Sequence, residues 1–430
     1  MNTQSHPTTG FPIPDYPRSA KRTATRSYSR IMSKILTALL SLLALAGRAQ
    51  DRIRQQDDLT QQDGLMQQNR MTQQDGILQL VLTSDVHYGI TRAHFRNADS
   101  VQATVVNKAM IAAIDKLPRQ VLPADSGIDA GKRISYIDAL VVTGDMANRE
   151  EKGIQCAASS WQQFQTDYTA GLTTKGSNRQ RTALWLTAGN HDVSNALGYC
   201  RYTEPARDAS AMAGIYNTML HPARERTKAD YNYATDKVHY SKDVGGVHLL
   251  FVNLWPDSTE RRWMEEDLKT VTPGTPVLLF THSMPDVEGR FFINPNGEHT
   301  INDSDKFENL LTEQFKDGSR ADQPAGIEQR SLAAFLKLHP AIVAWFHGHS
   351  NYNEFYDWHG PDNDLTLHCF RVDSPMKGKL SSKDETRLSF QLITIDARTK
   401  TMTVRECLWN TSPDDPSLLK WGQHRTVALN

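Results

Sequence analysis

The hydrophobic residues of the chain gather into short runs from residue 77 onward. In chain order, the main runs are ILQLVLTS, ALVVTG, ALWLTAG, GVHLLFVNL, PVLLFTH and AIVAWFHG. Each run is rich in Val, Ile, Leu or aromatic residues and has the length of a strand that is buried on both faces. The hydrophobic pattern therefore predicts a series of buried strands.

Helical patterns separate several of these strands. Apolar residues recur at helical spacing from Val101 to Ala112, DSTERRWMEEDL follows the fourth run with Asp257 or Ser258 as its N-cap, and IEQRSLAAFLKL precedes the sixth run. Strands that alternate with helices predict an α/β sheet rather than an all-β sandwich. Near the end of the chain, LTLHCFRV, RLSFQLITID and TMTVRECLW predict antiparallel strands that complete a sheet.

The N-terminal region has a different composition. Residues 18–34 carry six Lys or Arg residues and no acid, and then follow thirteen mostly apolar residues and the small residues Gly47 and Ala49. This order is typical of a secretory signal peptide, and the apolar segment is shorter than the roughly 20 residues that cross a bilayer. We therefore predict a signal-peptide region at 1–49, with Met32 where such a peptide normally starts. The protein would be exported, periplasmic or secreted, with no stable membrane anchor.

Three further segments follow. Residues 50–76 repeat QQD or QQN and are short of large apolar residues, which predicts a disordered Gln/Asp-rich linker. We place a single catalytic domain at 77–410 and a C-terminal tail at 411–430. If the protein is exported, disulfides are possible, but the sequence leaves open whether its cysteines pair or are buried thiols. These are Cys156, Cys200, Cys369 and Cys407.

Residues able to bind a metal ion follow five of the six runs. In chain order these segments are Asp85-Val86-His87, Gly144-Asp145, Gly189-Asn190-His191-Asp192, His282 and Gly348-His349. A lone Asp after a strand is usually a cap or a turn residue, so only the five segments together indicate a metal site. Functional residues of open α/β sheets collect at the carboxyl ends of strands, so we expect these side chains to converge. Mixed oxygen and nitrogen ligands suit manganese, iron or zinc.

This five-part pattern resembles the calcineurin-like metallophosphoesterase superfamily, which includes purple acid phosphatases, cyclic-nucleotide phosphodiesterases and acid sphingomyelinase. The resemblance covers about residues 77–410. It implies an α/β (α+β) fold, a two-sheet αββα sandwich with helices outside, and a pair of metal ions at the strand ends.

The resemblance also implies a role for individual residues. The implied metal ligands are Asp85, His87, Asp145, Asn190, His282, His349 and Asn351, and the implied catalytic residue is His191. Asp145 would bridge the two metal ions, and His191 would lie near the leaving group. Asp192 would either orient His191 or cap the following turn.

The last ligand position departs from the superfamily pattern, which is G-H-x-H. Gly348 places His349 first, so the second histidine position holds Asn351. An amide oxygen is a weaker metal ligand than an imidazole. The alternative is that His347 completes the first metal site. We favour the pair His349 and Asn351.

Together these features predict an exported, binuclear metal-dependent phosphoesterase. It would hydrolyse phosphomonoesters or phosphodiesters, of a small molecule, a lipid or a nucleotide, by attack of a metal-bound hydroxide. The net charge is −1 and no basic stripe with interleaved aromatic residues occurs, so we predict no dedicated nucleic-acid surface. The alternative is a binding module that keeps the fold without catalysis, and the presence of His191 argues against it.

Overall fold

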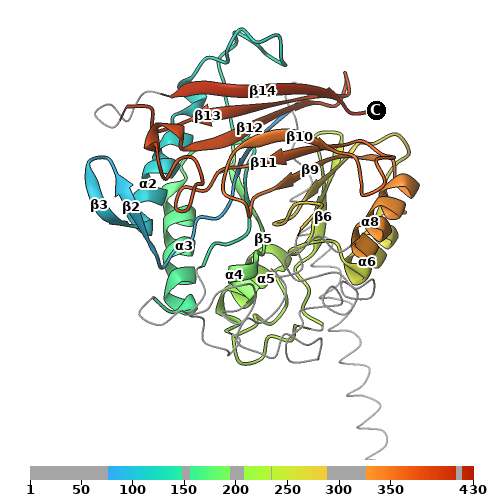
Figure 1. The fold of residues 1–430 in the computed structure, drawn as a ribbon, viewed down its shortest axis with the longest axis horizontal. Coiled ribbons are helices and arrows are strands. Elements are labelled where there is room, and N and C mark those ends of the chain that lie inside the picture. Colours follow the sequence, from blue (N-terminus) through green and yellow to red (C-terminus); the bar gives the residue numbers. More distant parts are fainter. Residues whose placement is uncertain (1–75, 148–154, 194–207, 234, 288–325, 413–418) are drawn as a thin grey trace, which may run out of the picture. The chain divides into compact units, whose positions relative to one another are not determined.

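Two six-stranded sheets form the core of the part of the chain that the structure describes (Figure 1). This structure is a computed structural model, and it describes residues 76–147, 155–193, 208–233, 235–287, 326–412 and 419–430. The chain divides into two units, Met1–Gln68 and Asn69–Asn430, and all described residues belong to the second. The predicted signal peptide and, except for Gly76, the predicted linker lie outside the described residues.

The first sheet has the strand order β14-β13-β12-β1-β4-β5. Its strands are β1 (Ile77–Thr83), β4 (Ala139–Thr143), β5 (Ala183–Thr187), β12 (Ser389–Asp396), β13 (Thr401–Leu408) and β14 (Lys420–Ala428). β1, β4 and β5 are mutually parallel, and β12, β13 and β14 continue the sheet with antiparallel pairing. The carboxyl ends of the three parallel strands therefore lie at one edge of this sheet.

The second sheet has the strand order β10-β11-β9-β8-β7-β6. Its strands are β6 (Tyr240–Val244), β7 (Val247–Phe251), β8 (Val277–Phe280), β9 (Ile342–His347), β10 (Glu354–Trp358) and β11 (Leu367–Arg371). β7, β8, β9 and β11 are parallel, and β6 and β10 flank them as antiparallel strands. This sheet thus also collects the carboxyl ends of parallel strands at one edge.

The helices lie outside the sheets (Figure 1). α2 and α3 accompany the first sheet, and α6 and α8 accompany the second. The bounds are α2 (Ala103–Ile114), α3 (Ala157–Gly171), α4 (Asn190–Val193), α5 (Ser210–Leu220), α6 (Ser258–Leu268) and α8 (Gly326–Leu338), with the short 3₁₀ helices η1 (Leu117–Arg119) and η3 (Glu385–Arg387). A hairpin of β2 (Thr91–Phe95) and β3 (Ala98–Gln102) precedes α2. Among the described residues, no helix is long and apolar enough to cross a membrane.

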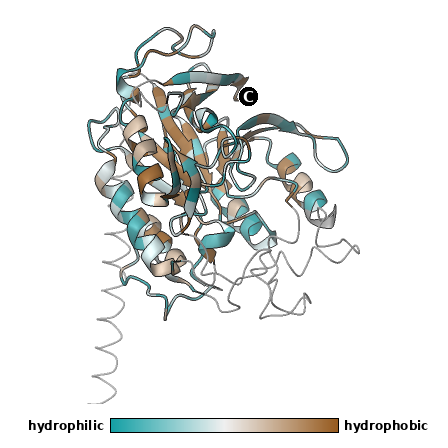
Figure 2. Cartoon of the chain, turned by 60° about the vertical axis from the view of Figure 1, so that its left-hand side comes forward, coloured by the Kyte–Doolittle hydropathy of each residue, from teal (hydrophilic) through white to brown (hydrophobic). Residues whose placement is uncertain are grey.

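Side chains alternate between the two faces of the buried strands. In β1, Leu78, Leu80 and Leu82 join a core cluster shared by both sheets, whereas Val81 joins the cluster that includes the helices. The rings of Trp185 and Phe251 meet across the two sheets with centroids 5.7 Å apart. Figure 2 shows the apolar colouring along the central strands and polar colouring on the outward faces of helices. The predicted two-sheet sandwich with helices outside is therefore confirmed.

A row of stacked aromatic rings crosses the inner face of the second sheet. It runs through Tyr240, Phe251, Phe280, Phe346 and Phe370, with neighbouring ring centroids 4.6–5.0 Å apart. Each ring pairs in register with the next strand's ring. Cross-strand aromatic pairs stabilise one register. This row therefore helps to fix how the parallel strands are aligned with one another.

The C-terminal part of the chain differs from the sequence prediction in two respects. β11, predicted within an antiparallel group, is parallel to β9 and ends at the same edge. The predicted tail at 411–430 contains β14, which pairs with β13 along most of its length, so the sheet continues past residue 410. β14 has a mostly exposed, polar sequence, which explains why hydrophobicity did not reveal it.

Candidate metal centre

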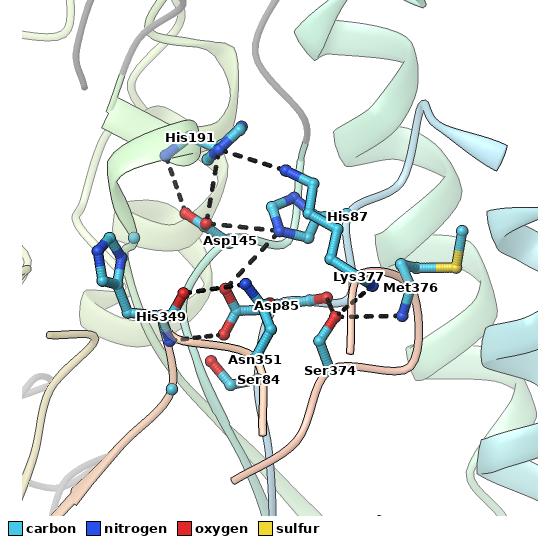
Figure 3. Close-up of polar contacts among 12 residues, drawn as sticks. Ser84, Asp85, His87, Asp145, His191, His349, Asn351, Ser374, Met376 and Lys377 are labelled. Carbon is cyan, nitrogen blue, oxygen red and sulfur yellow. Dashed lines mark hydrogen bonds and ion pairs between the residues drawn. The ribbon is translucent and has the colours of Figure 1, made fainter. Parts of the chain in front are cut away.

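The side chains that the sequence singles out converge at the carboxyl ends of the parallel strands (Figure 3). Asp85 and His87 follow β1, Asp145 follows β4, and Asn190 and His191 open α4 after β5. From the second sheet, His282 follows β8, and His349 and Asn351 follow β9. The fold thus brings all eight predicted site residues to one place, between the two sheets.

Asp145 lies at the centre of this cluster. Its Oδ2 atom is 3.6 Å from Nε2 of His87, 3.5 Å from Nε2 of His282 and 3.9 Å from Nε2 of His191. Two groups of potential ligands share this carboxylate, and these groups are His87–Asp145–His191 and Asp85–Asp145–His282. Asp145 therefore occupies the position that a carboxylate shared by two metal ions needs. The ring of His191 belongs to the first of these groups, so its position would also allow it to bind a metal ion.

A second set of contacts surrounds His282. Its Nδ1 atom is 2.7 Å from the carbonyl oxygen of Thr143. Because a carbonyl only accepts, Nδ1 carries the proton and Nε2 presents its lone pair to the site, the arrangement usual for metal-binding histidines. Nε2 lies 3.2 Å from Oδ1 of Asn190 and 3.0 Å from Nδ1 of His349. These atoms form a compact set of oxygen and nitrogen ligands.

Several buried atoms of the cluster lack a hydrogen bond. Among the described residues, Oδ1 of Asp85, Nδ1 of His87 and Oδ1 of Asn351 are buried and have no hydrogen-bond partner. Most buried polar atoms in proteins are satisfied, so such a concentration in one place calls for a missing partner. A carboxylate, an imidazole and an amide oxygen are suitable ligands for a divalent cation. The residues present therefore fit a metal centre.

His347 and Asn351 differ in where their side chains point. The buried ring of His347 places Nε2 2.9 Å from the hydroxyl of Tyr356 and Nδ1 3.1 Å from the carbonyl oxygen of Gly348. Asn351 donates from Nδ2 to the carbonyl oxygen of His349 at 3.0 Å and lies beside Asp85 in the cluster (Figure 3). These contacts favour the pair His349 and Asn351 over a ligand role for His347.

The backbone at the site adopts conformations that are rare elsewhere. Five of the eight predicted site residues have positive φ, and they are Asp85 (54°), His87 (41°), Asp145 (55°), His349 (68°) and Asn351 (60°). Non-glycine residues in this region are strained and cluster at functional sites. The sharp turns aim side chains from the strand ends into the space between the sheets.

The glycines that precede the ligands are required by close packing. A Cβ atom on Gly189 would meet Oδ1 of Asp145 at 2.2 Å, and a Cβ atom on Gly348 would meet Oδ2 of Asp85 at 2.4 Å. The G-D, G-N-H-D and G-H segments are therefore physically linked, because each glycine makes room for a ligand of another segment.

The charged groups of the cluster shift one another's pKa values. Burial opposes ionisation of Asp85, but the imidazole of His87, with Nε2 3.7 Å from Oδ1, and the charge of His282 outweigh burial and lower its pKa. Burial and the charge of Lys377 lower the pKa of His87. Burial also disfavours the charged form of His282, yet the carboxylates of Asp145 and Asp85 raise its pKa.

Asp192 has a structural role at the site. Its carboxylate accepts hydrogen bonds from the backbone N–H groups of Met146, Ala147 and Gly189 at 2.8–3.2 Å. It thus ties the loop after β4 to the loop after β5, which holds Asp145 beside His191. Burial and the nearby charge of Asp145 raise the pKa of Asp192 to about 7. Of the two roles predicted for Asp192, these contacts favour the cap of the turn after β5.

Sequence reasoning missed Lys377. Its ammonium lies 3.5 Å from Nε2 of His191 (Figure 3). The signal was the position of SPMKG after the apolar run LTLHCFRV, but that strand was predicted to be antiparallel. Because β11 is parallel to β9, the loop after it reaches the same edge as the ligands.

Comparisons with known proteins find no match among protein-family models or among curated proteins. Among solved structures, the chain is similar to PhoD, with 9% identity over 82% of this chain and 70% of that chain and a TM-score of 0.44. It is similar to Vps29 complexed with Zn²⁺ from Entamoeba histolytica, with 10% identity, 82% and 100% coverage and a TM-score of 0.29.

A third similar structure is the calcineurin-like phosphoesterase YfkN from Bacillus subtilis, with 11% identity, 82% and 91% coverage and a TM-score of 0.28. Its superfamily is the one that the sequence pattern resembles.

Proposed function

We propose that this protein is an exported, binuclear metal-dependent phosphoesterase that hydrolyses phosphomonoesters or phosphodiesters. One observation carries the proposal. Oδ2 of the buried Asp145 lies within 3.9 Å of three imidazole nitrogens from three different segments of the chain. Around it stand further oxygen and nitrogen ligands that would complete two adjacent metal sites, namely Asp85, Asn190, His349 and Asn351.

Two divalent ions in this centre would neutralise the charge of a phosphate ester and activate water for attack at neutral pH. The protein's part is to fix the ligands before substrate arrives. His282 is held by the carbonyl of Thr143, and the backbone N–H of His349 donates to Oδ2 of Asp85 at 2.8 Å. Ligands that are held by such contacts keep their geometry without reorganisation.

His191 is the group we propose to protonate the leaving oxygen. Its side chain is 12% exposed, so it lies at the rim of the buried cluster. Its backbone N–H donates to Oδ1 of Asp145 at 2.8 Å, which holds the backbone of His191 beside the shared carboxylate. Proton transfer by a positioned histidine typically contributes about 10²–10⁴-fold in rate.

The test is the variant Asp145→Asn. We expect bound metal to fall well below two equivalents per chain, because an amide cannot bridge two cations as a carboxylate does. Hydrolysis of p-nitrophenyl phosphate and bis(p-nitrophenyl) phosphate should fall by more than the 10–100-fold typical of an outer ligand contact. Metal analysis and steady-state rates, measured on manganese-loaded protein, check both expectations.

The control is Asp362→Asn, which removes an exposed carboxylate that pairs with Arg330 on the surface. It should keep wild-type metal content and rates, and both variants should keep the wild-type circular dichroism. Wild-type turnover in Asp145→Asn would refute the assignment. A wild-type protein without bound metal, even after incubation with manganese, would point instead to a non-catalytic binding module, the alternative that the unusual Asn351 keeps open.

A further inference from the structure

We infer that Lys377 is a substrate-binding residue that contacts a non-bridging phosphate oxygen and favours dianionic phosphomonoesters over monoanionic diesters. This inference rests on the proposed function and names the substrate class of that site. Lys377 comes from the loop after β11, and its ammonium lies 3.5 Å from Nε2 of His191. Figure 3 shows it reaching toward the ring of His191 beside His87.

The loop that carries Lys377 is bonded to the backbone of two predicted ligands. The hydroxyl of Ser374 donates to the carbonyl oxygen of Asp85 at 2.7 Å and accepts from the N–H of Lys377 at 2.9 Å. On the other side, the N–H of Lys379 donates to the carbonyl oxygen of Asn351 at 2.5 Å. The position of Lys377 is therefore set by the same turns that place the metal ligands.

A buried arginine also fixes the backbone of this loop. Arg92, on β2, is 2% exposed and donates from Nη1 to the carbonyl oxygen of Pro375 at 2.8 Å. Its Nη2 donates to the carbonyl oxygen of Ser381. A charged side chain is rarely buried without such partners. The hairpin before α2 thus has a role in the site, since it anchors the Lys377 loop from the protein interior.

The location of Lys377 suits a phosphate oxygen. If His191 faces the leaving group, as proposed, a phosphoryl group beside it also comes within reach of the Lys377 ammonium. A lysine ammonium offers three donors as a compact charge that adapts to phosphate oxygens. The imidazoles of the cluster would bind metal ions as neutral ligands. The Lys377 ammonium has no lone pair, so it would bind no metal ion and would keep its positive charge.

The charge of the centre indicates which ester it prefers. The two carboxylates, Asp85 and Asp145, offset two of the four charges of a pair of divalent cations, and Lys377 adds one more positive charge. A phosphomonoester carries close to two negative charges at neutral pH, because its second pKa is about 6, and a diester carries one. An added cation therefore stabilises the monoester more than the diester.

The experiment compares Lys377→Met with Lys379→Met in the full chain loaded with manganese. Lys379 is exposed, lies two residues away and places its ammonium 4.7 Å from the ring centroid of Tyr352. We expect Lys377→Met to lower kcat/KM for p-nitrophenyl phosphate by about 10–100-fold, the range for a lost hydrogen bond to a charged group. The diester rate should change less than about threefold, and Lys379→Met should match wild type in both.

A binding measurement separates this inference from the proposed function. At pH 8, calorimetry with inorganic phosphate should show weaker binding to Lys377→Met, whereas metal content and binding of monoanionic dimethyl phosphate should be unchanged. Equal losses for both esters, or no loss of phosphate binding, would overturn the inference. If wild type hydrolyses neither ester but Lys377→Met alone loses phosphate, the inference stands and the hydrolase proposal fails.

Discussion

His347 and His349 are one residue apart, yet their side chains have different surroundings. His347 is the last residue of β9, and its ring packs edge-on against Tyr356 of β10. Burial, followed by the charge of Arg371, holds its pKa well below the usual value, so this ring stays neutral. His349 follows the turn and faces His282. A neutral, hydrogen-bonded histidine inside the sheet is a structural residue, which leaves the amide of Asn351 as the candidate ligand.

At the residue scale we therefore predict different effects for His347→Ala and Asn351→Ala. Asn351→Ala should lower bound metal toward one equivalent per chain, with a loss of stability of about 1–2 kcal/mol because alanine is disfavoured at the positive φ of residue 351. His347→Ala should keep the metal but lower the free energy of unfolding by about 1–3 kcal/mol, because it leaves the Tyr356 hydroxyl unsatisfied. Metal analysis and urea unfolding distinguish the two. If only His347→Ala loses metal, His347 and not Asn351 completes the first metal site.

The sequence pointed to the candidate ligands more readily than to Lys377, for a physical reason. Aspartate and histidine at strand ends follow a spacing that metal coordination imposes, so they form a pattern. A lysine that binds phosphate needs only reach and charge, and its neighbours in SPMKG carry no such pattern. What reveals Lys377 is the hydrogen bonding of Ser374 to the backbone of Asp85, a contact between residues 289 positions apart.

At the scale of elements, prediction depended on burial. All six apolar runs form strands, and α6 begins as expected, with the Asp257 carboxylate accepting from the N–H groups of Thr259 and Glu260 at 2.9 Å. The strands that were missed, β2, β3, β6, β10 and β14, are largely exposed or half-buried. Their sequences therefore lack the continuous apolar run that marks a buried strand.

The turns between elements give a prediction of their own. A Cβ atom at Gly348 would lie 2.0 Å from Oγ of Ser84 and 2.4 Å from Oδ2 of Asp85, so Gly348→Ala must displace the loop after β1. We expect it to lower the free energy of unfolding by about 1–3 kcal/mol, as for other overpacked sites. Bound metal should fall as well, because Asp85 is a ligand in the proposed centre.

The matched control for that variant is Gly171→Ala at the end of α3, where the nearest atom to a Cβ is Cγ2 of Ile111 at 3.3 Å. This variant should keep its metal and change stability by less than about 1 kcal/mol. Thermal unfolding and metal analysis of the two variants test the idea that glycine at 348 serves the ligand geometry. Full metal binding by Gly348→Ala would contradict it.

For the whole molecule, the C-terminal strand joins the two sheets. Arg425 on β14 donates to both carboxylate oxygens of Asp357 on β10 at 2.7–2.8 Å. Burial raises the pKa of Asp357, but Arg425 and His368 outweigh it and lower this pKa. An aspartate with a lowered pKa contributes stability above about pH 4 and loses that contribution as the pH falls. The ion pair is partly exposed, so its contribution is about 1 kcal/mol or less.

β14 also completes the core between the sheets, because Val427 and Leu429 are 6% and 2% exposed and belong to the shared cluster. A chain that ends at Asn410 should therefore be several kcal/mol less stable, since each buried side chain contributes about 1.5–3 kcal/mol. It would also leave β13 as an unpaired edge strand, which promotes aggregation. Urea unfolding and light scattering measure both effects.

Two point variants serve as controls for the truncation. Arg425→Met should lose only the small ion-pair contribution, and Lys420→Ala, on the exposed end of the strand, should match wild type. Wild-type stability of the truncated chain would mean that the domain ends at residue 410 and that β14 contributes nothing to it.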